Sequence, residues 1–135
     1  MLARTFMTAD QLNLTARQHD ALIKVLGMLE RGELKHGPYH LSKAKIFNMG
    51  TWWIEGGCST AGCIGGWANH IAGSVLFNGI RNYNAPLRCL LYPGAEPECE
   101  DSNIRYSSIT TEEAAQALSN YLTTGKADWR SVLFE

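Results

Sequence analysis

The segment from Gly56 to His70 constrains the fold of this chain more than any other stretch. It contains Cys58, Cys63 and Trp67 among several glycines. A glycine inside a helix costs about 1 kcal/mol relative to alanine. A helix that tolerates several of them usually needs something to approach its backbone closely, such as another helix, an indole ring or a ligand. The sequence therefore predicts that this segment forms a helix whose backbone is tightly packed against a neighbour.

Residues 59–77 are predicted to form a central helix. Ser59 or Thr60 can cap its start, because a hydroxyl oxygen accepts hydrogen bonds from the free amides of a first helical turn. Apolar residues then recur at helical spacing, namely Ile64, Trp67, Ala68, Ile71, Val75 and Leu76. We expect this glycine-rich helix to pack between the first and last helices of the chain.

A first helix is predicted within residues 8–33. Thr15 followed by Gln18 fits a capping box, in which the two side chains satisfy free amides at the helix start. The apolar stripe of this helix is Leu22, Ile23, Val25, Leu26 and Leu29. Gly32 is a plausible stop, because glycine readily adopts the left-handed conformation that ends helices.

A last helix is predicted to begin near Thr110. Thr110 with Glu113 fits a second capping box, and acidic residues favour the positive end of the helix dipole. Gly125 should end this helix. The apolar residues that follow should dock on the core, namely Trp129, Val132, Leu133 and Phe134.

The two remaining segments are less regular. In the first, Leu41–Met49 fits a short strand or a short helix, and periodicity does not decide between them. Residues 78–109 are predicted to be a long irregular connection, in which Leu87–Tyr92 is a strand or one helical turn. Connections of this length in a compact domain are often functional.

Composition bounds the class of protein. The 135 residues are 45% hydrophobic and 19% charged, which suits one soluble domain spanning residues 1–135. We expect a mainly α fold: a small helical bundle with a glycine-rich central helix, a long connection and at most a minor pair of short strands. The formal net charge is −1, so no global field attracts nucleic acid or anionic lipid.

The N-terminus and the cysteines predict the compartment. Residues 1–7 lack the continuous apolar run of a signal peptide, and nothing approaches the apolar length of a spanning helix. We therefore expect a cytoplasmic protein without a membrane partner. In a reducing cytoplasm, the cysteines are expected to be buried thiols, metal ligands or reactive thiols rather than disulfides.

Two stretches of the chain resemble a group of small bacterial and phage proteins. Residues 47–52 read F-N-M-x-x-W and residues 58–68 read C-x-T-x-x-C-I-x-G-W-A, whereas the group carries F-[DN]-M-x-x-W followed by C-G-T-x-x-C-[ILF]-A-G-[WH]-A. The helix opening at residues 109–115 is also similar. This chain departs from the pattern at Ser59, at Gly65 and in an insertion before Cys58. The resemblance implies a shared fold core and a phage or prophage origin, and it implies no activity.

The cysteine segment leaves three kinds of chemistry open. In a zinc site, Cys58, Cys63 and His70 would supply three ligands, with Cys89, Cys99, His36 or His40 as the fourth. In a reactive-thiol site, Cys58 would gain a lowered pKa from the start of the helix, with His36 or His40 as its base. In the third interpretation, which we favour, the thiols are small core residues. That interpretation requires no cofactor, no metal and no catalytic residue.

The favoured function is that of a small non-catalytic accessory or interaction protein that binds a protein partner. The partner surface is predicted within residues 78–109, where tyrosines and arginines alternate, and Tyr83, Arg88 and Tyr92 are the candidate contacts. These residue types are enriched at binding hot spots. The alternative from another class is a small cysteine-dependent or zinc-dependent enzyme that uses Cys58 or Cys63 with a histidine.

Overall fold

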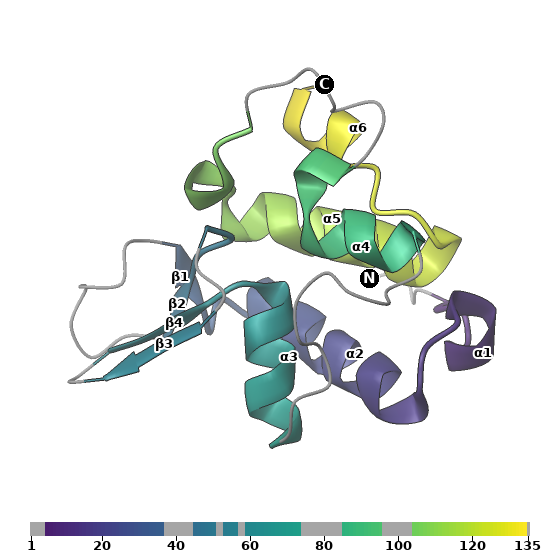
Figure 1. Ribbon diagram of the computed structural model, residues 1–135, viewed down its shortest axis with the longest axis horizontal. Helices are drawn as coiled ribbons and strands as arrows, with labels where there is room; N and C mark the ends of the chain where they lie inside the picture. The colour runs from purple at the N-terminus through teal and green to yellow at the C-terminus, as the bar shows by residue number, and fades with distance from the viewer. Residues whose placement is uncertain are drawn as a thin grey trace.

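The computed structural model describes residues 5–36, 45–50, 53–56, 59–73, 85–95 and 104–134, and it is mainly α-helical (Figure 1). Its helices fall into two groups, with a small sheet at one end of the molecule. The lower group in Figure 1 contains α1 (Ala9–Leu12), α2 (Ala16–Glu30) and α3 (Ile64–Ala72). The upper group contains α4 (Ala85–Leu91), α5 (Thr111–Thr124) and α6 (Trp129–Phe134), with the 3-10 turns η1 (Pro93–Ala95) and η3 (Tyr106–Ser108).

The first and last long helices, α2 and α5, begin at the capping residues that the sequence predicts, Thr15 and Thr110. The Thr15 side chain accepts a hydrogen bond from the Gln18 amide at 3.1 Å, and the Gln18 side chain accepts one from the Thr15 amide. Thr110 and Glu113 make the same reciprocal pair at the start of α5. Gly125 ends α5 with a φ of 87°, in the left-handed region that favours glycine. Both capping boxes are therefore confirmed.

The prediction of a mainly α fold is confirmed, and the minor strand element that it allowed is a sheet of four short strands. They are β1 (Lys35–His36), β2 (Lys45–Phe47), β3 (Trp53–Gly56) and β4 (Ser59–Gly62), in the order β1-β2-β4-β3. β2 runs parallel to β1 and to β4, while β3 pairs antiparallel with β4 and places Trp53 opposite Gly62. The ambiguity over Leu41–Met49 is thus decided in favour of a strand at its described end.

The predicted helix over residues 59–77 is wrong over residues 59–63. Ser59–Gly62 forms β4, the helix begins only at Ile64, and Cys63 occupies the N-cap position with extended backbone. Ser59 and Thr60 do not cap a helix, because their segment forms strand β4. This strand hydrogen-bonds to β2 on one side and to β3 on the other. Gly73 ends the helix with a φ of 70°, and residues 74–77 lie outside the described residues.

Residues 78–109 contain more regular structure than predicted. Ala85–Leu91 is helical, so the apolar run at Leu87–Tyr92 is a helical turn and not a strand. Pro86 does not prevent this helix, because proline is tolerated in a first turn where its missing amide hydrogen has no helical partner anyway. Leu87, Leu90 and Leu91 are buried. Residues 78–84 and 96–103 lie outside the described residues.

The core is organised around α2. This helix packs against α3 and also against α5, so α2, rather than the glycine-rich helix, lies between the other two. Its buried face consists of Ala21, Leu22, Val25, Leu26 and Leu29. Trp129 anchors α6 on this core, and its indole Nε1 donates a hydrogen bond to the Leu90 carbonyl at 3.1 Å.

Candidate functional site: a groove between α2 and α3

An aromatic cluster joins α3 to the sheet. Trp67 is almost fully buried, and its indole Nε1 donates to the Ile46 carbonyl of β2 at 2.9 Å. Trp53 of β3 meets Trp67 edge-on, with ring centroids 5.0 Å apart. One helical turn after Trp67, the exposed His70 stacks on Trp53 at 4.9 Å and 26° between planes. Aromatic pairs of this kind add about 0.5–1.5 kcal/mol each beyond their buried area, so the cluster stabilises the contact between α3 and the sheet.

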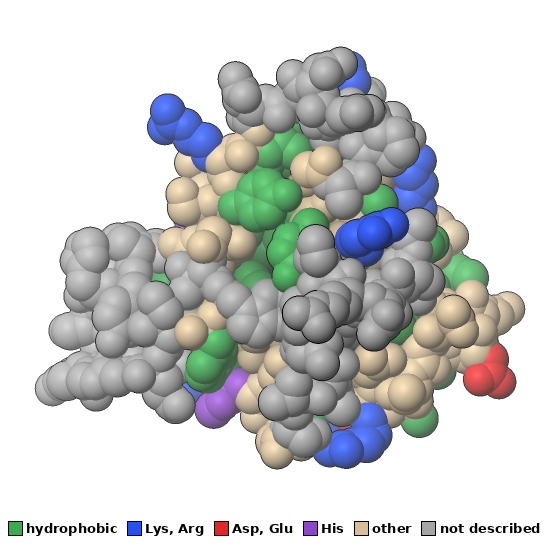
Figure 2. All heavy atoms as spheres, in the orientation of Figure 1, with side chains coloured by type: hydrophobic (Ala, Val, Ile, Leu, Met, Phe, Trp, Pro, Cys, Tyr) green, Lys and Arg blue, Asp and Glu red, His purple; other side chains and the backbone are tan. Residues whose placement is uncertain are grey.

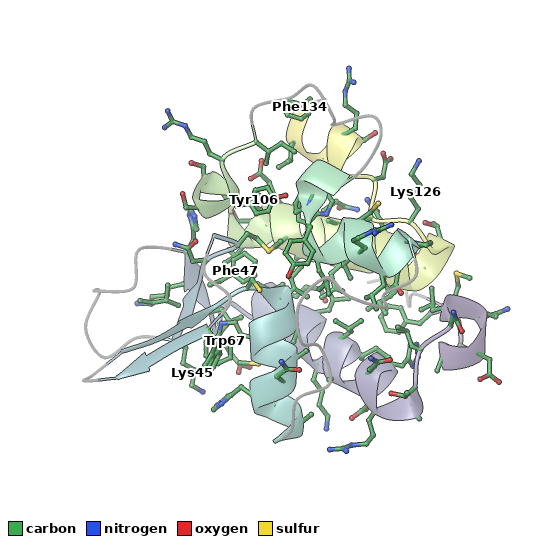
Figure 3. The ribbon with its side chains drawn as sticks, in the orientation of Figure 1. Lys45, Phe47, Trp67, Tyr106, Lys126 and Phe134 are labelled. Atoms are coloured by element: carbon green, nitrogen blue, oxygen red, sulfur yellow. The ribbon has the colours of Figure 1, made fainter. Side chains whose placement is uncertain are left out.

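A groove of about 740 Å³ runs beside this cluster, between α2 and α3, and is called the α2–α3 groove below. Its apolar lining comes from Phe6, Ile23, Leu26, Met28, Trp67 and Ile71. Figure 3 shows Lys45 beside Trp67, where α3 meets the sheet. A volume of this size lies within the range of ordinary ligand pockets, about 300–1,000 Å³.

The charged lining of the α2–α3 groove is mixed but mainly basic. Its charged and titratable side chains are Lys24, Arg31, Lys45 and His70, against Glu30 and Glu33. Lys24 makes an exposed ion pair with Asp20 one turn earlier, at 3.0 Å. Arg31 makes an ion pair with Glu33 through its Nε. Exposed pairs of this kind stabilise a protein by about 1 kcal/mol or less.

Gly27 lets the Arg31 side chain lie back along α2. A Cβ atom placed on Gly27 would come within 2.8 Å of Nη1 of Arg31 and 3.6 Å of its Cζ. The guanidinium therefore occupies the notch that the glycine leaves. Sequence reasoning missed this arrangement, although an unexplained glycine four residues before an arginine in an amphipathic helix was its signal.

The predicted metal and thiol residues are not brought together in the described part of the chain. Cys63 is 3% exposed, and burial raises the pKa of its thiol, while the amides of Gly66 and Gly65 act in the opposite direction. His70 lies seven residues further along α3, a rise of about 10 Å. Cys58 lies outside the described residues, and because residue 59 starts a strand, it does not precede a helix.

Among the described residues, no three or more histidine, cysteine, aspartate or glutamate side chains are grouped so that they could hold a metal ion. His36, one of the predicted fourth ligands, has Nε2 2.7 Å from the Ser107 carbonyl oxygen. Cys89 is half-buried on α4. Cys99 and His40 lie outside the described residues.

Two of the three predicted partner contacts lie at the end of α4, Arg88 within the helix and Tyr92 directly after it. The exposed Arg88 lies one turn before Tyr92, whose amide donates to the Arg88 carbonyl at 2.9 Å. Tyr92 is half-buried, and its phenol pKa is raised by burial and then by the nearby Cys63 and Tyr106. Figure 2 shows hydrophobic side chains gathered between η3 and the start of α3. Tyr83 lies outside the described residues.

Comparisons with protein-family models, with curated proteins and with solved structures find no match for this chain. The resemblance to small bacterial and phage proteins therefore stays a prediction. Most of its described residues are buried, including Phe47, Ile64, Trp67 and Ala68. The signature thus marks the junction of β2 with α3 rather than an exposed surface. In the described residues, no helix is long and apolar enough to cross a membrane.

Proposed function

We propose that this chain is a small non-catalytic interaction domain that binds a protein partner through the α2–α3 groove. The observation that carries the proposal is the composition of the groove, in which an apolar lining is bordered by Lys24, Arg31 and Lys45. Aromatic residues, methionine and arginine are enriched at the centres of protein interfaces. Phe6, Met28 and Arg31 supply these types within one groove, and each has exposed surface there.

The face of α4 that carries Arg88 and Tyr92 is a second candidate surface. Tyr92 directly follows the helix, its amide donates to the Arg88 carbonyl, and hydrophobic side chains gather nearby in Figure 2. Arginine and tyrosine are typical hot-spot residues. The α2–α3 groove ranks above this face because it is concave and combines charge with an apolar lining.

The origin and compartment of the protein are part of the same proposal. The signature at residues 47–52 and 58–68 supports a phage-encoded or prophage-encoded accessory protein. Such a protein would act in the bacterial cytoplasm on a host protein, with no nucleic acid or membrane as its partner. The alternative, a cysteine-dependent or zinc-dependent enzyme, is weakened by the burial and raised pKa of Cys63, and it would depend on Cys58.

The test is affinity capture from a bacterial lysate with matched surface variants. The groove variant is Lys24→Glu with Lys45→Glu, and the α4 variant is Arg88→Ala. All three positions are exposed, so both proteins should fold, which circular dichroism checks. A partner retained by the wild type and by Arg88→Ala, but lost from the groove variant, supports the proposal. Equal capture by all three proteins refutes it.

The same preparations test the enzymatic alternative. Metal analysis of the purified wild-type protein measures zinc, and thiol titration against pH measures thiol reactivity. One equivalent of zinc that Cys63→Ser abolishes, or one thiol that titrates well below about 8.5, would favour the enzyme.

A further inference from the structure

Two features of the groove favour the position of the Arg31 side chain along α2. Gly27 leaves room for its guanidinium on the surface of α2, as the 2.8 Å approach of Nη1 to a hypothetical Cβ shows. Its Nε donates to a carboxylate oxygen of Glu33. A planar guanidinium fixed at Nε presents its two terminal nitrogens as a fork, the arrangement that matches a carboxylate.

The terminal nitrogens of this fork are available to a ligand. The ion pair with Glu33 uses Nε, and within the described part of the chain neither Nη1 nor Nη2 of Arg31 donates a hydrogen bond. Arg31 itself is an exposed residue at the end of α2. A carboxylate that enters the α2–α3 groove can therefore meet two N–H donors that are already oriented.

The charge around this fork favours an anion. Three permanent cations line the groove, Lys24, Arg31 and Lys45, against the carboxylates of Glu30 and Glu33, so the lining has three positive and two negative charges. Asp20, which is not part of the lining, pairs with Lys24 at 3.0 Å, so Lys45 and the Arg31 fork supply the positive charge offered to a ligand. Glu33 is engaged by Nε of Arg31, and Glu30 is the other carboxylate of the lining.

We infer that the α2–α3 groove binds an acidic peptide segment of the protein partner, with an aspartate or glutamate side chain on the Arg31 fork and neighbouring apolar side chains on Ile23, Met28 and Ile71. This inference rests on the proposed function and names the chemistry of its partner. Lys45 and Lys24 border the groove and attract further acidic residues of the segment.

Arg31 also has a purely structural role that must be separated from recognition. A cation near the last turn of a helix stabilises the helix dipole, and Arg31 pairs with Glu33. Gly27→Ala separates the two roles. The added methyl group displaces the flexible end of Arg31 and so disrupts the fork, whereas alanine is the better helix former. This variant should unfold at the same or a higher urea concentration than the wild type while losing recognition.

The experiment selects ligands from a displayed library of random short peptides on the immobilised full chain. We expect enriched peptides that combine aspartate or glutamate with leucine, phenylalanine or tryptophan. Fluorescence anisotropy then measures the Kd of one selected peptide. Gly27→Ala and Arg31→Gln should each weaken its binding at least about tenfold, since a charge-assisted pair is lost. The control Arg105→Gln, at an exposed arginine outside the groove, should leave the Kd unchanged.

The outcomes separate this inference from the proposed function. Neutral or basic selected peptides, no enrichment at all, or acidic peptides whose binding survives both Gly27→Ala and Arg31→Gln would each overturn the acidic-peptide inference. The proposed function would still stand if Lys24→Glu with Lys45→Glu abolishes capture of the partner from the lysate. Both ideas fail together if that groove variant also captures the partner normally.

Discussion

Removing the Tyr121 hydroxyl should stabilise this protein. Tyr121 lies on α5 with no exposed surface, and its hydroxyl has no hydrogen-bond partner in the described part of the structure. An unsatisfied buried polar group costs about 1–3 kcal/mol. Tyr121→Phe removes that cost and keeps the ring, so we expect the free energy of unfolding at pH 7 to rise by about 1 kcal/mol.

The pH dependence of the free energy of unfolding gives a second expected value. Burial raises the pKa of Tyr121 from 10.0 to about 12. Between these values the unfolded chain loses the phenolic proton while the folded protein keeps it, so stability falls as pH rises. With these two pKa values, the loss grows by about 1.3 kcal/mol between pH 9 and pH 11. Tyr121→Phe has no phenol at this position, so it does not lose this stability. The difference in free energy of unfolding between the variant and the wild type should therefore grow by about 1.3 kcal/mol between pH 9 and pH 11.

Urea unfolding at several pH values measures both effects. Tyr106→Phe is the matched control, because the Tyr106 hydroxyl accepts a hydrogen bond from the Gly94 amide at 2.9 Å. That variant should lose about 0.5–1.5 kcal/mol of stability. The reasoning about Tyr121 is refuted if Tyr121→Phe is less stable than the wild type and the difference between them does not change with pH.

Three further predictions concern the core. Trp67→Phe should lower the free energy of unfolding in urea by about 2–4 kcal/mol, because it removes the hydrogen bond to the Ile46 carbonyl and opens a cavity. Trp129→Phe should cost a similar amount, because it removes the hydrogen bond to the Leu90 carbonyl. Gly66→Leu should cost about 1–3 kcal/mol or more by overpacking the buried first turn of α3, and an unchanged melting temperature would contradict this. Cys63 should react with a thiol reagent far more slowly than the half-buried Cys89, which mass spectrometry of labelled peptides can check.

Local sequence chemistry predicted those features of the fold that depend on neighbours in the chain. The capping boxes at Thr15 and Thr110 and the left-handed glycine at 125 need only residues within one turn, and all are confirmed. The burial of Leu22, Leu26 and Leu29 followed from helical periodicity alone. The caps and the buried faces of these helices depend on interactions between residues a few positions apart, so the sequence alone predicts them.

The errors lie where partners distant in the sequence decide the structure. Ser59 and Thr60 are good capping residues, yet they form β4 because β2 and β3 pair with them. The α2–α3 groove was missed for the same reason. Its lining joins α2 to Lys45 and Trp67, and their proximity follows from sheet order and helix packing that no local pattern encodes. The Arg88 and Tyr92 pair could be anticipated, since residues four apart lie together once a helix is recognised.

Lysine cross-linking of the captured complex tests the central claim, that the partner occupies the α2–α3 groove, most directly. Lys24 and Lys45 both line the groove, whereas the exposed Lys126 lies on the other side of the molecule in Figure 3. An amine-reactive cross-linker followed by mass spectrometry reports which lysines lie near the partner. We predict cross-links to the partner from Lys24 and Lys45 and none from Lys126. Cross-links to the partner from Lys126, with none from either groove lysine, would contradict the account.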